Sequence, residues 1–156
     1  MRIFISAIFA LVIASLTHAE PLSPRQGWHV SPTDKPYEQL IQDLKSAVKF
    51  HGMGVVTQAG PTKAAKNRGI IIPGNRVIGV FNNDFAVRTL ATSTAAMIEA
   101  PIRFYVTQNS SGTATLSYKT PDFVFTPYMP EAGDTLRLIA AELDQKFADI
   151  AQTATK

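Results

Sequence analysis

One stretch of the chain constrains its fold more than any other, because apolar and polar residues alternate on both sides of a short turn. The two alternating segments are residues 102–109 and 113–119, and residues 110–112 lie between them. A three-residue loop with glycine, here Gly112, in the left-handed conformation is a common connection between antiparallel strands. The stretch therefore predicts a β-hairpin, and the sheet that contains it must be at least partly antiparallel.

The register of this hairpin follows from the residues that share a face. Pairing Asn109 with Thr113 gathers four apolar residues on one face: Phe104 opposite Tyr118, and Val106 opposite Leu116. The other face then carries six residues with polar groups: Arg103, Tyr105, Thr107, Thr115, Ser117 and Lys119. A slip of one residue would mix the two sets, so the pattern predicts this register. We expect the polar face to be the solvated side of a sheet, or else a polar ligand site or a dimer surface.

Apolar residues at helical spacing predict a helix on each side of the hairpin. The first follows residues 32–34, which favour a helix start, and it ends at Gly52. The last begins near Asp134 and continues almost to the end of the chain. Their apolar stripes consist of Tyr37, Leu40, Ile41, Leu44 and Val48, and of Leu136, Ile139, Leu143, Phe147 and Ile150.

A further helix is predicted between these two, from residue 83 to about Ile98, before Pro101. Asn82 and Asn83 are both good N-cap residues, and we expect Asn83 to be the cap. Four threonine and serine residues lower the intrinsic propensity of this segment, so that packing must hold the helix in place.

Short β-prone runs complete the pattern at residues 28–31, 53–57, 70–72 and 76–81, while 58–69 reads as a loop with one helical turn. The element order is β-α-β-β-β-α-β-β-α. This order predicts a single α+β domain, with a mostly antiparallel sheet packed against about three amphipathic helices.

Residues 119–132 are the least regular part of the chain. The aromatic loop 123–129 within them is expected to pack over the sheet, or to form a lid or an interaction patch.

The first nineteen residues are typical of a secretory signal peptide. Arg2 precedes the apolar residues 3–16, and Ala19 is the small residue that signal peptidase prefers. The apolar run is shorter than the roughly 18 residues of a membrane span, although a retained N-terminal anchor is the alternative. We therefore expect a domain at residues 20–156 in the periplasm or secreted, with no stable membrane anchor after cleavage.

Composition excludes several kinds of site. The chain has no cysteine, so it has neither disulfides nor a thiolate metal site. Its formal charge is only +3, and its one basic cluster is Lys63, Lys66 and Arg68. A nucleic-acid site needs a longer basic stripe with aromatic residues, so we expect a solvated loop there and no nucleic-acid partner.

Reactive constellations are sparse. Asp84 and Glu99 are far apart along one predicted helix, so they cannot act as a catalytic pair of carboxylates. A weak alternative is a copper(I) site from His29, His51 and Met53, whose spacing follows no ligand motif. We expect no metal and no cofactor.

Two stretches resemble a known family. Residues 81–85 and 90–103 are similar to the core of the domain of unknown function 302 family, in which a Phe-Gly-Asn-Pro-like turn precedes a helix of small residues and a Leu-Pro entry into the hairpin. Here Asn82, Asp84 and Ala100 replace the usual Gly, Pro and Leu. Residues 117–121 resemble its Ser-Tyr-Asn-x-Pro stretch, with Lys119 in place of Asn. The resemblance spans about residues 37–147. It implies a compact α+β fold, is compatible with homodimers, and implies no established activity.

These observations lead to two hypotheses of function. The first is a non-catalytic exported protein that binds a small ligand or a partner and forms a homodimer, with five candidate ligand-binding residues: Asn82, Asn83, Arg103, Tyr105 and Tyr118. The second is a small periplasmic enzyme without metal, whose site would use Tyr118, Asn82, Arg103 and His29.

Overall fold

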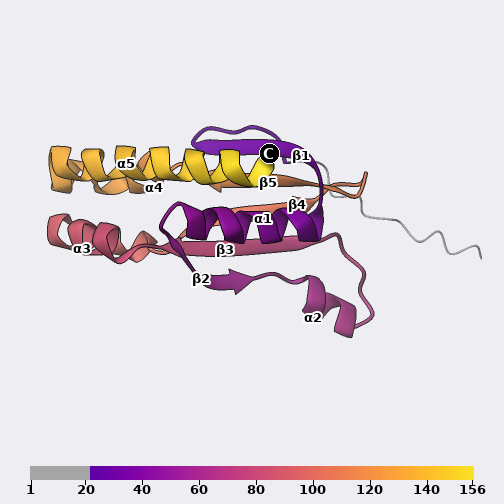
Figure 1. Cartoon of the computed structure of the whole chain (residues 1–156). Coiled ribbons are helices and arrows are strands. Elements are labelled where there is room, and N and C mark those ends of the chain that lie inside the picture. Colours follow the sequence, from indigo (N-terminus) through magenta and orange to yellow (C-terminus); the bar gives the residue numbers. More distant parts are fainter. Residues whose placement is uncertain (1–21) are drawn as a thin grey trace, which may run out of the picture.

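Five strands form one antiparallel sheet in the computed structural model, which describes residues 22–156 (Figure 1). The expected signal peptide, residues 1–19, lies outside the described residues. The strand order is β1-β5-β4-β3-β2. The strands are β1 (Trp28–Pro36), β2 (Gly54–Ala59), β3 (Asn75–Phe81), β4 (Ile102–Gln108) and β5 (Thr113–Lys119). The predicted fold class, α+β with a mostly antiparallel sheet, is confirmed.

The hairpin at the centre of the sheet has the predicted register. Phe104 pairs with Tyr118, and Val106 pairs with Leu116. Gly112 adopts a positive φ of 86° in the turn, as the three-residue loop requires. Because β5 and β4 are the second and third strands of the sheet, this register determines which residues face the helices across the whole sheet.

Two long helices, α1 (Tyr37–Phe50) and α5 (Met129–Thr155), pack side by side and contact the sheet. Both bury their predicted apolar stripes. The remaining helices are α2 (Thr62–Asn67), α3 (Asn83–Thr92) and α4 (Pro121–Phe125), with short 3-10 helices η1 (Ala96–Glu99) and η2 (Thr126–Tyr128). No helix within residues 22–156 is long and apolar enough to cross a membrane.

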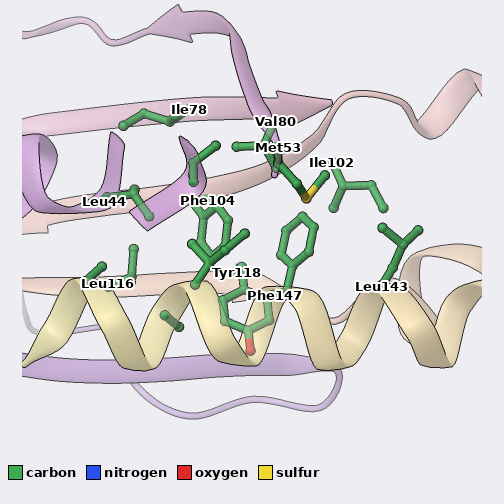
Figure 2. Close-up of a cluster of buried hydrophobic side chains, with 14 of the residues drawn as sticks. Leu44, Met53, Ile78, Val80, Ile102, Phe104, Leu116, Tyr118, Leu143 and Phe147 are labelled. Carbon is green, nitrogen blue, oxygen red and sulfur yellow. The ribbon is translucent and has the colours of Figure 1, made fainter. Parts of the chain in front are cut away.

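Aromatic side chains fill the centre of the core between the sheet and α5 (Figure 2). Phe104 of β4 and Phe147 of α5 are fully buried and stack with ring centroids 4.6 Å apart. Tyr118 of β5 packs against both rings. Aromatic pairs of this kind contribute about 0.5–1.5 kcal/mol beyond the area that they bury, so this cluster fixes α5 on the sheet.

The first strand is longer than the sequence pattern predicts. Residues 32–36 continue β1 instead of starting a helix, and α1 begins at Tyr37 after Pro36. Because β1 lies at the sheet edge, the prolines at positions 32 and 36 cost no central ladder hydrogen bonds. The helix-start interpretation of residues 32–34 was therefore wrong, whereas the predicted end is confirmed by a φ of 74° at Gly52.

The segment before β3 also differs from the prediction. Residues 70–72 are not a strand, whereas α2 just before them matches the helical turn predicted within residues 58–69. Ile70 and Ile71 are 48% and 79% exposed, so their apolar side chains find no sheet face. The expected element order is correct apart from this strand and the additional short helices.

The middle helix differs in its cap and its length. Asn82, not Asn83, is the N-cap, because its side chain accepts hydrogen bonds from the backbone N–H groups of Asp84 and Phe85. The helix ends at Thr92, and Ser93 is extended. A 3-10 turn then leads to Pro101, so the predicted continuous helix to Ile98 was wrong. The low helix propensity of the Thr92–Thr94 cluster explains the early end.

Candidate functional site

The face of the sheet that points away from α1 and α5, which we call the outer face, carries the predicted polar residues. It comprises Trp28, Val30 and Pro32 of β1, Thr115, Ser117 and Lys119 of β5, Arg103, Tyr105 and Thr107 of β4, and Asn75, Val77 and Gly79 of β3. Thr115 and Ser117 are completely buried, whereas Arg103 and Lys119 are exposed.

A hollow of about 380 Å³ lies at one end of the outer face, and we call it the outer hollow. Strands β1, β3, β4 and β5 supply most of its wall, and η1 and α4 add one residue each. The residues that line it are Trp28, Asn75, Val77, Glu99, Ile102, Arg103, Tyr105, Tyr118, Lys119 and Val124.

Trp28 and two cationic side chains beside its ring form one corner of the outer hollow. Trp28 is the one tryptophan of the chain, and it pairs directly with Lys119 across the β1–β5 ladder. The Lys119 ammonium lies 5.8 Å from the centre of the indole ring, and the Arg25 guanidinium lies 5.3 Å from it. Both distances suit cation–π attraction, which holds two positive charges at this corner.

Arg103 brings a further positive charge from β4. Among residues 22–156, neither Arg103 nor Lys119 forms an ion pair. Glu99 is the only carboxylate among the residues that line the hollow within this part of the chain. Its Oε1 accepts a hydrogen bond of 2.8 Å from the Tyr128 hydroxyl, and this bond, together with burial, raises the pKa of Tyr128. The cations of the hollow are thus not neutralised by a direct partner in the described chain.

Tyr105 occupies the middle of the outer face. Asn75 of β3 donates a hydrogen bond from Nδ2 to the Tyr105 hydroxyl, which fixes the direction of the phenol ring.

On the far side of Tyr105 a second hollow of about 200 Å³ is lined by Leu22, Gly74 and Thr107, among others. The buried Thr107 hydroxyl has no hydrogen-bond partner among the described residues. Leu22 belongs to the segment before β1, so this segment runs back beside the hairpin (Figure 1).

The five predicted ligand-binding residues do not come together. Arg103, Tyr105 and Tyr118 line the outer hollow, but Asn82 and Asn83 do not. Asn82 caps α3 and also donates from Nδ2 to the Gly52 carbonyl at 3.0 Å. Asn83 is exposed in the first turn of α3. Asn82 is thus a structural residue, because its amide oxygen and amide nitrogen both bond the backbone.

Tyr118 belongs mainly to the core. Its ring packs against Phe104 and Phe147 on one side and stacks on His29 at a centroid distance of 5.0 Å. Burial, with a smaller effect of the nearby Asp144 carboxylate, raises its pKa to about 12. A phenol with so high a pKa stays protonated at neutral pH, so Tyr118 is a poor general base.

His29, His51 and Met53, the candidate copper(I) ligands, each make other contacts. His29 bonds Ser31 through Nε2 at 2.7 Å, and His51 bonds Thr153 through Nε2 at 2.8 Å. Met53 is buried beneath α3. No group of three histidine, aspartate or glutamate side chains within residues 22–156 could hold a metal ion.

An apolar recess under α3 is too small for a ligand. It measures only about 30 Å³ and is lined by core residues such as Phe85, Phe125 and Phe147. This volume is close to that of one water molecule in the liquid. The outer hollow is therefore the stronger candidate site.

Sequence reasoning missed five contributors to the outer hollow: Trp28, Asn75, Val77, Glu99 and Ile102. Trp28 was assigned only to a short strand, because its pairing with Lys119 depends on β1 joining the edge of the hairpin. Its status as the single tryptophan was the available signal. Glu99 reaches the hollow through the turn before β4, and no local sequence pattern predicts that meeting.

Comparisons with known proteins agree on one family. The family model "Domain of unknown function DUF302" matches residues 29–154. A solved structure described as an uncharacterized conserved protein DUF302 from Bacillus stearothermophilus superposes with a TM-score of 0.74 at 19% identity. The superposition covers 85% of this chain and 100% of that chain. No curated protein matches.

Proposed function

The chain belongs to the DUF302 family, which has no assigned function, and from this premise we propose that it is an exported, non-catalytic protein that binds a small ligand in the outer hollow. The observation that carries this proposal is the hollow itself. Its volume of about 380 Å³ lies within the range of roughly 300–1,000 Å³ of small-molecule sites. Its wall combines apolar surface with a few polar groups, which is the usual chemistry of such sites.

The rigidity of its wall also supports a binding role. Most of the lining residues lie on four hydrogen-bonded strands instead of on loops. The hydrogen bond from Asn75 holds Tyr105, and the ladder pairing holds Trp28 against Lys119. Because these side chains are already oriented, a ligand would lose little of its binding energy to ordering the site.

The enzyme alternative was expected to use Tyr118, Asn82, Arg103 and His29, of which only Tyr118 and Arg103 line the outer hollow. The contact that most resembles a catalytic pair is instead the one between His29 and Ser31. The Ser31 hydroxyl lies 2.7 Å from His29 Nε2, which is the spacing of a serine nucleophile and its base. However, neither residue lines the outer hollow. No carboxylate within residues 22–156 hydrogen-bonds His29 to orient the ring. We therefore expect no covalent labelling of Ser31 by diisopropyl fluorophosphate, and stoichiometric labelling would favour the enzyme.

The proposal includes a homodimer, as the sequence analysis expects. Three apolar side chains are exposed on neighbouring helices: Val87 and Leu90 of α3, and Leu138 of α5 are 57%, 50% and 65% exposed. Leu138 precedes Glu142 by one turn, and the Glu142 carboxylate forms two hydrogen bonds of 2.7 Å with Arg88 of α3. Leu138 therefore lies near the contact between α3 and α5, whereas Val87 and Leu90 are exposed elsewhere on α3. We propose that these three side chains contribute to the dimer interface, and we call them the α3–α5 patch.

Trp28 makes the ligand site testable, because the fluorescence of the one tryptophan reports on the outer hollow. The protein should be purified from its own compartment and examined by native mass spectrometry before and after unfolding and refolding. We expect a small retained molecule that is lost on unfolding and that changes the Trp28 emission when it is added back.

Two variants locate that molecule. Arg103→Ala should reduce its binding at least 10-fold, because Arg103 lines the hollow. Arg68→Ala is the matched control, since Arg68 is an exposed arginine beside α2, away from the hollow. Equal binding by both variants and by Trp28→Phe would place the site elsewhere, and a protein that never retains or binds a molecule would contradict the proposed function.

A further inference from the structure

We propose that the ligand of the outer hollow is a small organic anion, with one anionic group bound by Arg103 and Lys119 and an apolar body lying on the sheet. This inference rests on the proposed function, because it names the chemical class that the same site would accept. It follows from three observations: the cations that line the hollow, the hydrogen bond that already occupies one oxygen of Glu99, and the apolar part of the wall.

The cations are the first observation. Arg103 and Lys119 both line the hollow, and neither has an ion-pair partner among the described residues. Arg25 lies nearby over the Trp28 ring. Unpaired cations around a concave surface attract anions more strongly than the same charges on a convex surface, because low-dielectric walls focus the field. An arginine can also bind a carboxylate or phosphate group with two parallel hydrogen bonds.

The acidic neighbour is the second observation. Glu99 is the carboxylate of the wall, and a cationic ligand would have to bind there. One of its oxygens already accepts the Tyr128 hydroxyl hydrogen. The hollow is lined by one arginine, one lysine and one glutamate. The positive charges outnumber the negative one, so the balance of charge favours an anionic ligand over a cationic ligand.

The apolar wall is the third observation. Val77, Ile102 and Val124 line the hollow beside the Trp28 ring. A bare inorganic anion would leave this surface in contact with water, whereas an organic body would cover it and gain the free energy of removing apolar surface from water. The combination therefore points to a carboxylate or phosphate ester with an apolar group of aromatic size.

A matched set of probes tests this class. Benzoate and phenyl phosphate carry the proposed anionic group, while benzyl alcohol and benzylamine have the same ring with a neutral or a cationic group. Binding to the full domain is measured by calorimetry and by Trp28 emission. We expect the two anions to bind at least 10-fold more tightly than the neutral and cationic probes, with affinity that falls as salt rises.

Variants separate the anion contact from the rest of the site. Arg103→Gln and Lys119→Gln should each weaken the binding of the two anions about 10-fold and leave benzyl alcohol unchanged. Arg68→Gln is the control and should change nothing. Both target residues are exposed, so we expect the variants to fold, which their thermal unfolding checks.

Three outcomes would overturn the inference. If benzyl alcohol or benzylamine binds as tightly as benzoate, or if the molecule retained from the native compartment is neutral or cationic, the class is wrong while the binding function stands. If neither anion binds at millimolar concentration, the class is also wrong. If, in addition, no molecule is retained by the protein from its native compartment, the proposed binding function itself is contradicted.

Discussion

Tyr118 shows at the residue scale how one side chain can belong to both the core and a site. Its ring packs against Phe104 and Phe147, and yet it also borders the outer hollow. Because burial raises its pKa, the hydroxyl contributes as a neutral group at physiological pH. Its role in the hollow is therefore to provide surface, not charge.

The first prediction concerns stability at high pH. Tyr118 has a folded pKa of about 12, above its ordinary value of 10.0. Folding therefore favours the protonated phenol, and its contribution to stability is complete below pH 10 and is lost as pH rises toward 12. In urea unfolding, Tyr118→Phe should lose less stability than the natural protein between those values. Some loss should remain, because burial also raises the pKa of Tyr37. Equal losses for the two proteins would contradict this assignment.

The second prediction separates Asn82 from Asn83. Only Asn82 accepts hydrogen bonds from the first turn of α3, at 2.9 Å from Asp84 N and 3.3 Å from Phe85 N. Asn82→Ala should lower the free energy of unfolding by about 1–2 kcal/mol, as loss of an N-cap does. Asn83→Ala is the control and should stay within about 0.5 kcal/mol. Similar losses for both variants in urea unfolding would show that the cap bonds are not what holds the start of α3.

The sequence could predict that one of these asparagines is the cap but not which one. Both residue types are suitable, and the choice depends on where β3 ends. Phe81 is still paired with Gly54 of β2, so Asn82 is the first residue free to leave the sheet. It also bonds the Gly52 carbonyl, which belongs to a segment 30 residues earlier. Such a contact is invisible to local capping rules.

At the scale of elements, the strongest periodic patterns were predicted well and Pro32 was misleading. The hairpin register and the stripes of α1 and α5 are as predicted, because each depends on a local period. Residues 32–34, which include Pro32, were interpreted as a helix start, but β1 is an edge strand that tolerates this proline. Whether a strand lies at an edge is a property of the whole sheet, so a local pattern cannot supply it.

The third prediction concerns the start of α5. The helix is interrupted at Gly133, whose φ of 62° and ψ of −150° are accessible essentially to glycine alone. Gly133→Ala should therefore cost about 1–3 kcal/mol of stability, although no atom would clash with the added carbon. Gly54→Ala is a suitable control, because its φ is not positive and its new carbon would meet only Phe81 O at 3.6 Å. Thermal unfolding that ranks Gly54→Ala as the more damaging change would contradict this explanation.

At the scale of the whole molecule, the two faces of the sheet have different roles. One face buries the aromatic core against α1 and α5, and the other face carries the outer hollow. The sequence predicted which residues of the hairpin share the outer face, including Arg103 and Tyr105, but not that Thr115 and Ser117 would be buried there. Their burial depends on β1 beside them and on the long side chains around them, and both come from tertiary packing.

The fourth prediction concerns the homodimer and the α3–α5 patch. The patch exposes Leu90 and Leu138 at 50% and 65% of their surface, and covering them with a second copy would remove that apolar surface from water. Light scattering should therefore give twice the mass of one chain at high micromolar concentration. Leu90→Glu should raise the dimer dissociation constant at least ~10-fold, because it would place a charge in an apolar contact. Phe50→Glu is the control, since Phe50 is 80% exposed at the end of α1. A natural protein with the mass of one chain would end the dimer proposal, and a dimer weakened equally by both variants would place its interface elsewhere.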